Sequence, residues 1–449
     1  MIHIRLRNIK CITLALCILL LSAPALQAAP FVYVANAGDT TVSVIDAANN
    51  MVIATVDLGF PPNNDGVAIT PDGKTVYVST ATHVDNFVVR IDVATNTTIL
   101  PNIQMSGNPD SIAIAPNGLF AYVTCNDGTI NRITLATNAV DVIGGGLSNP
   151  GDITIAPNGL TAYVCDLGLM AIVPVNLITN TILLANQVSI YDEPYGIKVT
   201  PDNAYAYVCS FNNGQVIQLN LANPLAPTIT NTIIIPIPLG GASPASPRGI
   251  ALTADGNTMY VTDFKFQNHT VTPINISNPA SLSTGTQVTV GFDPWVIAIT
   301  PDGTSAYVSN NGTSNPGTVT ELDITTRLAP TVKTTVDIGN IPAGLAITPM
   351  NLLPPSSVSG CKTQNVFFLQ TDYINNITWT APATGSPVAY NIYRDATLTE
   401  LVATVPASGT LQYYDHGRNP SVIYSYYITS VDSSGNQSMA ASVTVTNPC

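Results

Sequence analysis

The chain has 449 residues, of which 46% are apolar and only 9% are charged. Its formal net charge is −13 and it contains no basic cluster, which argues against nucleic acid as a partner. Regularly placed Val, Ile and Tyr residues exclude a disordered chain. The many Asn, Thr, Gly, Ser and Pro residues between them indicate an all-β protein with numerous turns.

Residues 1–29 have the features of a secretory signal peptide. Arg5, Arg7 and Lys10 form a basic start, and the apolar run Cys11–Leu21 is too short to cross a bilayer. Small residues around Ala28 then provide a cleavage site. We therefore expect an exported protein, periplasmic or secreted, with no transmembrane segment after cleavage.

A hairpin whose second strand contains Tyr-Val recurs through residues 30–350. In the copy Gly66–Val78, an apolar strand leads through Thr-Pro-Asp-Gly, a tight-turn sequence, into the Tyr-Val strand. We name these strands a and b; two further strands, c and d, follow in each repeat. Repeats at intervals of 41 to 53 residues are typical of β-propeller blades. The strand b tyrosines are Tyr33, Tyr77, Tyr122, Tyr163, Tyr207, Tyr260 and Tyr307.

The two ends of this region predict how the ring closes. Phe31–Val34 is a strand b with no strand a before it, whereas Gly344–Thr348 is a strand a with no strand b after it. If the two pair, they complete one mixed blade and leave no exposed sheet edge. The sequence therefore predicts a seven-bladed propeller over residues 30–350, closed by the N-terminal strand b and the C-terminal strand a.

The repeats resemble the YVTN-type β-propeller repeat, in which Tyr-Val-[Ser/Thr/Ala]-Asn is followed by Val-Ser-Val-Ile-Asp. The similar stretches include VYVANAGDTTVSVIDAANNMVIATVDLG (Val32–Gly59) and AYVSNNGTSNPGTVTELDITT (Ala306–Thr326). Asp166 and Phe211 depart from the pattern at the Asn position, and Asn220–Pro247 is a long insertion. The resemblance implies an exported propeller but supplies no shared catalytic residue.

The pattern changes after a linker at residues 351–357. Residues 358–449 contain alternating short strands that suit a β-sandwich and resemble a fibronectin type III domain. In that resemblance Trp379 is the buried tryptophan of the second strand, Tyr390 lies on the third, and Tyr424 forms the tyrosine corner.

Five cysteines remain after signal cleavage, so at least one is unpaired. Cys125, Cys165 and Cys209 lie in or next to strand b, where we expect buried free thiols. Cys361 and Cys449 flank the last domain. A disulfide between them is one of the pairings that the sequence allows.

Candidate ligand residues lie where the repeats disagree, because repeated positions form the scaffold. The residue at the entry to strand a differs from copy to copy, and these residues surround the mouth of the channel in a propeller. Here we expect a pocket for a cationic, polar or glycan ligand. Its predicted residues are Asp65, Asp110, Asp152, Tyr195, Lys198, Arg248 and Trp295.

Each of these residues has an expected role and an alternative. Tyr195 and Trp295 would stack on the ligand, and Arg248 would clamp an anion. The alternative for the aspartates is turn formation alone. For Lys198, we expect a side chain that extends into the channel towards Glu193 or an aspartate rather than a catalytic group.

We expect an exported, non-catalytic binding or scaffold protein that presents a propeller face to a protein, glycan or small polar ligand. The repeats contain no Ser-His-Asp grouping and no zinc or haem motif, which argues against catalysis, and we predict no cofactor. One alternative is a lactonase or quinone-linked enzyme at the channel mouth, with Ca²⁺ held by Asp65, Asp110, Asp152 and Asp293. Another is a purely structural cell-surface protein.

Overall fold

The computed structural model describes residues 30–446, except 81–85, 239, 242–243, 266, 313–314, 350–354, 368–369, 383–386, 396–397, 399, 432–436 and 439. The predicted signal peptide, most of the predicted linker and Cys449 lie outside the described residues. Strands are almost the only regular secondary structure of the described chain. No described helix is long and apolar enough to cross a membrane.

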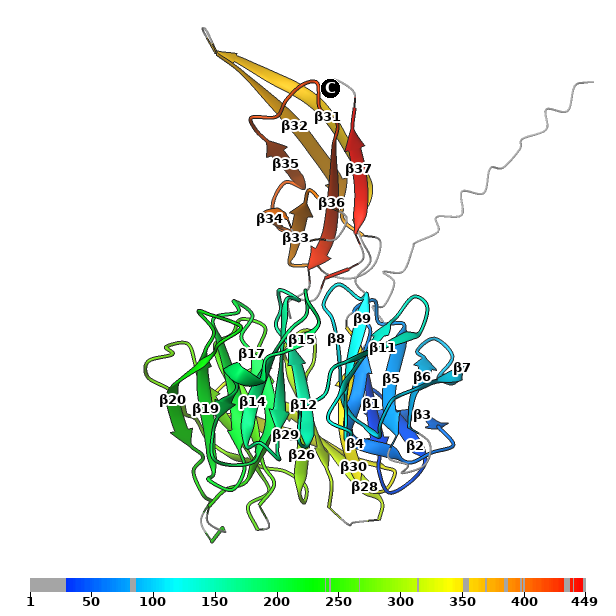
Figure 1. Ribbon diagram of the computed structural model, residues 1–449, viewed down its shortest axis with the longest axis vertical. Helices are drawn as coiled ribbons and strands as arrows, with labels where there is room; N and C mark the ends of the chain where they lie inside the picture. Colours follow the sequence, from blue (N-terminus) through cyan, green and yellow to red (C-terminus); the bar gives the residue numbers. More distant parts are fainter. Residues whose placement is uncertain are drawn as a thin grey trace, which may run out of the picture.

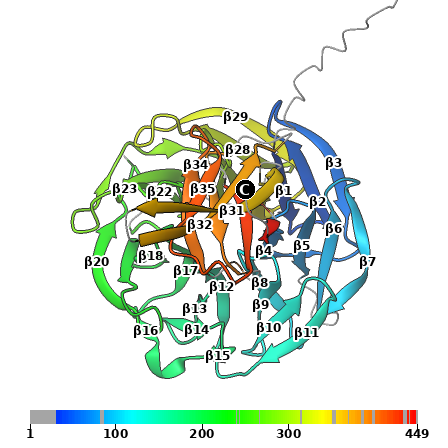
Figure 2. The same cartoon turned by 90° about the horizontal axis from the view of Figure 1, so that it is seen from above.

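The part of the chain before residue 349 forms seven antiparallel sheets of four or five strands (Figures 1 and 2). The first sheet joins β1 (Phe31–Asn36), β2 (Thr41–Asp46) and β3 (Met51–Asp57) to β30 (Pro342–Ile347). The second contains β4 (Pro62–Ile69), β5 (Thr75–Thr80), β6 (Phe87–Asp92) and β7 (Thr97–Gln104). The third contains β8 (Pro109–Ile114), β9 (Phe120–Cys125), β10 (Ile130–Thr134) and β11 (Ala139–Ile143). The fourth contains β12 (Pro150–Ile155), β13 (Thr161–Asp166), β14 (Ala171–Asn176), β15 (Thr181–Ile182) and β16 (Val188–Ser189), with a 3-10 turn at Leu184–Asn186.

The remaining three sheets of the ring repeat this arrangement. The fifth contains β17 (Pro194–Val199), β18 (Tyr205–Ser210), β19 (Gln215–Asn220) and β20 (Thr228–Ile234). The sixth contains β21 (Pro247–Leu252), β22 (Thr258–Asp263), β23 (Thr270–Asn275), β24 (Ser283–Thr284) and β25 (Val288–Thr289). The seventh contains β26 (Pro294–Ile299), β27 (Ser305–Asn310), β28 (Gly317–Asp323) and β29 (Thr331–Ile338).

The innermost strands contact one another in a closed circle, in the order β4, β8, β12, β17, β21, β26, β30 and β4 again. The circle closes because β30 pairs with β1, with Val32 opposite Ile347 and Val34 opposite Leu345. The two ends of the repeat region therefore share one sheet, and the fold is propeller-like.

The tyrosine of each Tyr-Val strand fastens neighbouring sheets together. All seven tyrosines are almost completely buried between sheets, where apolar side chains surround them. The Tyr307 hydroxyl donates to Asn50 Oδ1 in the next sheet at 2.8 Å, and the Tyr33 hydroxyl donates to Asn96 Oδ1 at 2.6 Å. Asn50 and Asn96 occupy turns with φ of 57° and 52°, a conformation that asparagine tolerates well. The recurring tyrosine is thus a packing element with a hydrogen bond at its tip.

Two further sheets follow the ring. One contains β31 (Ser356–Phe367), β32 (Gln370–Thr380) and β35 (Gln412–Asp415), and the other contains β33 (Ala389–Tyr393), β34 (Leu401–Pro406), β36 (Tyr424–Val431) and β37 (Ala441–Val445). Trp379, Tyr390 and Tyr426 lie in their shared core. The Tyr424 hydroxyl accepts a hydrogen bond from the Asn419 N–H at 3.2 Å, and Cys361 is disulfide-bonded. Its predicted pairing with Cys449 stays a prediction.

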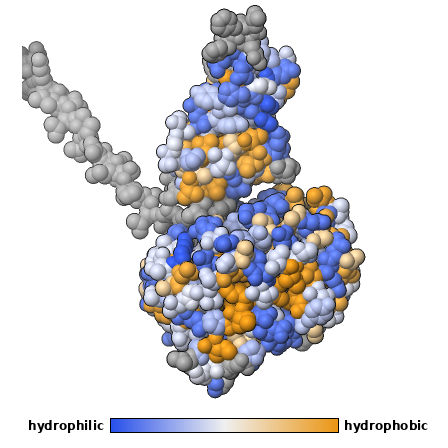
Figure 3. All heavy atoms as spheres, turned by 90° about the vertical axis from the view of Figure 1, so that its left-hand side faces the viewer, coloured by the Kyte–Doolittle hydropathy of each residue, from blue (hydrophilic) through white to orange (hydrophobic). Residues whose placement is uncertain are grey.

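The C-terminal sheets lie over one end of the ring (Figures 1 and 2). Each inner strand begins at the opposite end, which carries the entry residues, and β30 leads towards β31 after Ile347. Apolar patches interrupt the polar surface on the flank of the ring (Figure 3). They do not mark the channel, which is enclosed by the inner strands.

Candidate functional site

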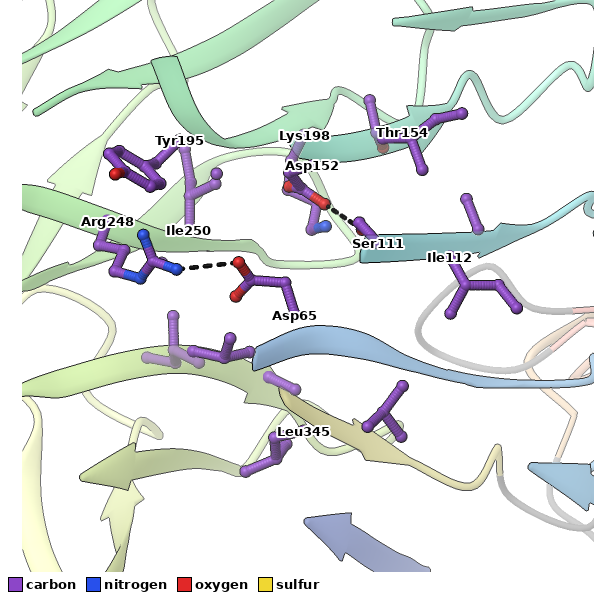
Figure 4. Close-up of a pocket in the computed structure, with 18 of the residues that line it drawn as sticks. Asp65, Ser111, Ile112, Asp152, Thr154, Tyr195, Lys198, Arg248, Ile250 and Leu345 are labelled. Atoms are coloured by element: carbon purple, nitrogen blue, oxygen red, sulfur yellow. Dashed lines mark hydrogen bonds and ion pairs between the residues drawn. The ribbon is translucent and has the colours of Figure 1, made fainter. Parts of the chain in front are cut away.

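A cavity of about 320 Å³ lies at the centre of the ring, where the inner strands meet. Its walls combine aliphatic side chains with a few polar ones (Figure 4). Six of the seven predicted ligand residues line it, namely Asp65, Asp152, Tyr195, Lys198, Arg248 and Trp295. Asp110 is not among the lining residues.

Asp65, Arg248 and Trp295 form a crossbar over the channel. Asp65 lies in the middle of β4, and Arg248 lies on β21, on the far side of the circle of inner strands. Arg248 Nη2 donates to Asp65 Oδ2 at 2.8 Å, and Trp295 Nε1 donates to Asp65 Oδ1 at 2.7 Å. Both carboxylate oxygens of Asp65 are therefore occupied by donors from other blades rather than by its own turn. We refer to these three residues as the crossbar.

Aromatic rings hold the guanidinium of Arg248 in place. Its central carbon lies 3.2 Å from the centroid of the Trp295 ring and 4.3 Å from that of Tyr195. Phe211 and Phe264 extend this cluster, with Phe211 packed against Tyr195 and Phe264 against Trp295. One face of each predicted stacking ring is thus covered by arginine, and Arg248 is already paired with a carboxylate.

A second repeated bond positions the entry residues, and the sequence patterns did not reveal it. The residue two positions after the strand b tyrosine is usually Ser, Thr or Cys, and its hydroxyl or thiol donates to an entry-residue carbonyl in the next sheet. The observed pairs are Ser79 to Asp110 (2.5 Å), Thr124 to Gly151 (2.8 Å), Cys165 to Tyr195 (2.6 Å), Thr262 to Trp295 (3.1 Å) and Ser309 to Ala343 (2.6 Å). These bonds fix the backbone from which the variable side chains project. The sequence did contain a signal for this bond, namely a small residue with a hydroxyl or thiol two positions after the strand b tyrosine.

Asp152 links three neighbouring inner strands. Its Oδ1 accepts a hydrogen bond from the Ser111 hydroxyl at 3.0 Å, and its Oδ2 accepts one from the Ile197 N–H at 3.1 Å. It therefore supports the wall of the cavity (Figure 4). Each oxygen still has a lone pair that a ligand hydroxyl can use.

Asp110 lies near the mouth and has a raised pKa. Burial raises its pKa to about 7, the negative charges of Asp65 and Asp152 act in the same direction, and Arg248 opposes them. A carboxyl that titrates near neutrality is the form expected of a proton-transfer group, but the same shift arises wherever several acids crowd together.

Replacing Asp110 with Asn should stabilise the protein at pH 8 but not at pH 4. The raised pKa means that ionising Asp110 costs stability; this cost is absent near the ordinary value of 3.8 and reaches its full size above about 7. We expect the free energy of unfolding at pH 8 to rise by an amount on the order of 1–4 kcal/mol, as measured by denaturant unfolding. The exposed Asp337→Asn is the matched control. An equal effect of Asp110→Asn at both pH values would contradict the shift.

The predicted calcium ligands do not form a metal site in the described part of the chain. No group of three or more His, Cys, Asp or Glu side chains there could hold a metal ion. Asp293 is not a lining residue, and its N–H donates to His269 Nδ1 at 3.1 Å. The charges of Asp65 and Asp152 raise the pKa of Asp110, but the three carboxylates are not such a group.

Lys198 lines the cavity beside Asp152 (Figure 4). Among the described residues its ammonium makes no ion pair and no hydrogen bond, either with Glu193 or with an aspartate. Lys198 is thus a charged residue of the cavity wall that no described side chain pairs with.

Comparison with known proteins supports the fold. No protein-family model and no curated protein matches the sequence. A protein of unknown function from Desulfotomaculum acetoxidans matches with a TM-score of 0.60 and 17% identity, over 71% of this chain and 99% of its own. A periplasmic gluconolactonase from Pseudomonas aeruginosa matches with a TM-score of 0.60 and 15% identity, over 72% and 99%. Hydrazine synthase from Kuenenia stuttgartiensis matches with a TM-score of 0.52 and 20% identity, over 60% and 86%.

At these identities the similarity shows the fold and no activity. The chain belongs to the class of β-propeller-like proteins, and neighbours of that class include a periplasmic enzyme.

Proposed function

We propose that this chain is an exported, seven-bladed propeller of the YVTN type that binds a small polar ligand in its central channel. A fibronectin type III-like module at the opposite end acts as a spacer or a second contact. The observation that carries this proposal is the contrast between constant and variable positions. Tyr-Val and the residue that follows it repeat around the ring, whereas the entry residues differ in charge and chemistry.

The cavity has the composition of a small-molecule site. Aliphatic walls surround a few fixed polar groups, and its volume is at the lower end of the range for ligand pockets. The crossbar and the backbone bonds from strand b hold these groups rigidly before any ligand arrives, which lowers the entropy cost of binding. A ring with a purely structural role would not need polar groups fixed around its central cavity.

Binding to the mature chain, residues 30–449, tests this proposal. We expect at least one compound from a panel of sugars, sugar acids, amino acids and amines to bind in isothermal titration. Asp110→Asn should change its affinity by about tenfold because the charge beside the cavity is removed, while Asp337→Asn should leave the affinity unchanged. Failure of the whole panel, with the folded state verified by melting, would refute the proposal and favour a structural role.

Lactone hydrolysis at the same mouth is the second candidate. Two observations favour it, namely the pKa of about 7 at Asp110 and the fold similarity to the periplasmic gluconolactonase. If Asp110 is a general base, hydrolysis of an aldonolactone should rise with pH around 7 and disappear in Asp110→Asn. A chain that binds ligand but leaves the lactone intact at every pH would restrict the function to binding.

A further inference from the structure

The position of Lys198 is unusual within the ring. In every repeat, one residue of strand a lies opposite the strand b tyrosine, and Lys198 lies opposite Tyr207 in this register. The other six positions hold alanine or threonine, namely Ala68, Ala113, Thr154, Ala251, Ala298 and Ala346. Small side chains leave room at the centre of the ring, and one long cation enters that room.

The other charged residues of the cavity wall already have partners. Arg248 is paired with Asp65 and lies between two rings. Asp152 accepts hydrogen bonds from a hydroxyl and a backbone N–H. A positive charge in a partly dry cavity is costly without an opposite charge, so the ammonium of Lys198 favours an anion in the space before it.

A further donor faces the same space. Thr154, a buried neighbour of Lys198 on the adjacent inner strand, lines the cavity with its side chain. Arg248 lines it too, but Asp65 and two aromatic rings already hold its guanidinium, and its Nε is buried. An anion that enters the channel therefore finds one unpaired cation and one hydroxyl.

We propose that the ligand of this channel is a small organic monocarboxylate, whose carboxylate is held by Lys198. This inference rests on the proposed function, since it names the ligand class of the same site. A single charge matches Lys198, whereas a doubly charged phosphate would be repelled by Asp152 and Asp110. The aliphatic walls, which include Leu345, cover the carbon skeleton, and the spare lone pairs of Asp152 accept hydroxyl groups from it.

Matched pairs of ligands test the charge directly on the wild-type mature chain. Gluconate with gluconamide and lactate with lactamide differ only in the carboxylate. We expect at least one carboxylate of such a panel to have an affinity about 10-fold or more above that of its amide, because the amide loses a hydrogen bond between charged groups. Equal affinity for acid and amide, or tighter binding of inorganic phosphate, would overturn the inference.

The variant Lys198→Met tests whether the ammonium of Lys198 is the group that binds the carboxylate. Methionine keeps the apolar stem and removes the ammonium, so carboxylate affinity should fall about 10-fold or more while amide affinity stays the same. Lys74→Met is the control, because that lysine is 73% exposed in a turn remote from the cavity lining. Unchanged carboxylate binding in a folded Lys198→Met protein would overturn the assignment. If neutral sugars bind and carboxylates do not, the binding function stands and the ligand class is wrong; if neither binds, both proposals fail.

Discussion

A chain that ends at Asn340 should not fold, although a chain that ends at Pro349 should melt cooperatively. The shorter chain lacks β30, so β1 loses its pairing partner and the circle of inner strands opens. It also loses the two hydrogen bonds between Phe31 and Thr348, which lie 317 residues apart: the Phe31 N–H donates to the Thr348 hydroxyl, and the Thr348 N–H donates to the Phe31 carbonyl. The buried side chains of Val32 and Val34 then face water.

The expected effect is the loss of the folded state, because the total stability of a domain is only about 5–15 kcal/mol. An open ring must expose apolar surface on both sides of the gap and leave strand edges unpaired. Circular dichroism and thermal melting of the two chains measure whether each one folds. The chain that ends at Pro349 controls for the removal of the C-terminal sheets. A soluble, cooperatively melting protein that ends at Asn340 would contradict ring closure by β30.

Replacing Asp65 with Ala should destabilise the protein by about 3–5 kcal/mol, a large effect for one residue of the wall. The substitution leaves the buried guanidinium of Arg248 without its carboxylate and removes the acceptor of the Trp295 N–H. Arg248→Met should cost less, because the apolar stem can stay between the rings and Asp65 is partly exposed. Denaturant unfolding measures both changes.

The double variant Asp65→Ala/Arg248→Met measures how strongly the stabilising effects of these two residues depend on each other. If the two residues act as a unit, its loss of stability should be clearly smaller than the sum of the single losses. Asp141→Ala is the matched control: Asp141 also pairs with an arginine, Arg132, but is 59% exposed, so we expect a cost below about 1 kcal/mol. Additive losses for Asp65 and Arg248 would show that the crossbar is not a coupled element.

The repetitive part of the fold was predictable because it depends on local chemistry repeated many times. The Tyr-Val strands, the Pro-x-Gly turns and the pairing of Val32 with the segment near Ile347 each leave a pattern in neighbouring residues. The same reasoning indicated Asp65 as an informative position. The similarity to solved structures supports a propeller-like ring, whereas the YVTN and fibronectin type III assignments stay proposals.

The partners within the site could not be predicted, since they join residues that are distant in sequence. Asp65 and Arg248 are 183 residues apart, and nothing near either one specifies the other. We therefore expected Arg248 to be free for an anion, and the structure gives it a carboxylate and two rings instead. Lys198 shows the converse case. We expected its side chain to extend into the channel, but only the ring geometry reveals the cavity in front of it.

A crystal structure of the mature chain with the tightest-binding compound of the panel tests the central claim most directly. We predict ligand density inside the ring, with an anionic group at Lys198 and the carbon skeleton against the aliphatic walls near Leu345. Density on the flank of the ring or on the C-terminal sheets, with the cavity occupied only by water, would contradict it.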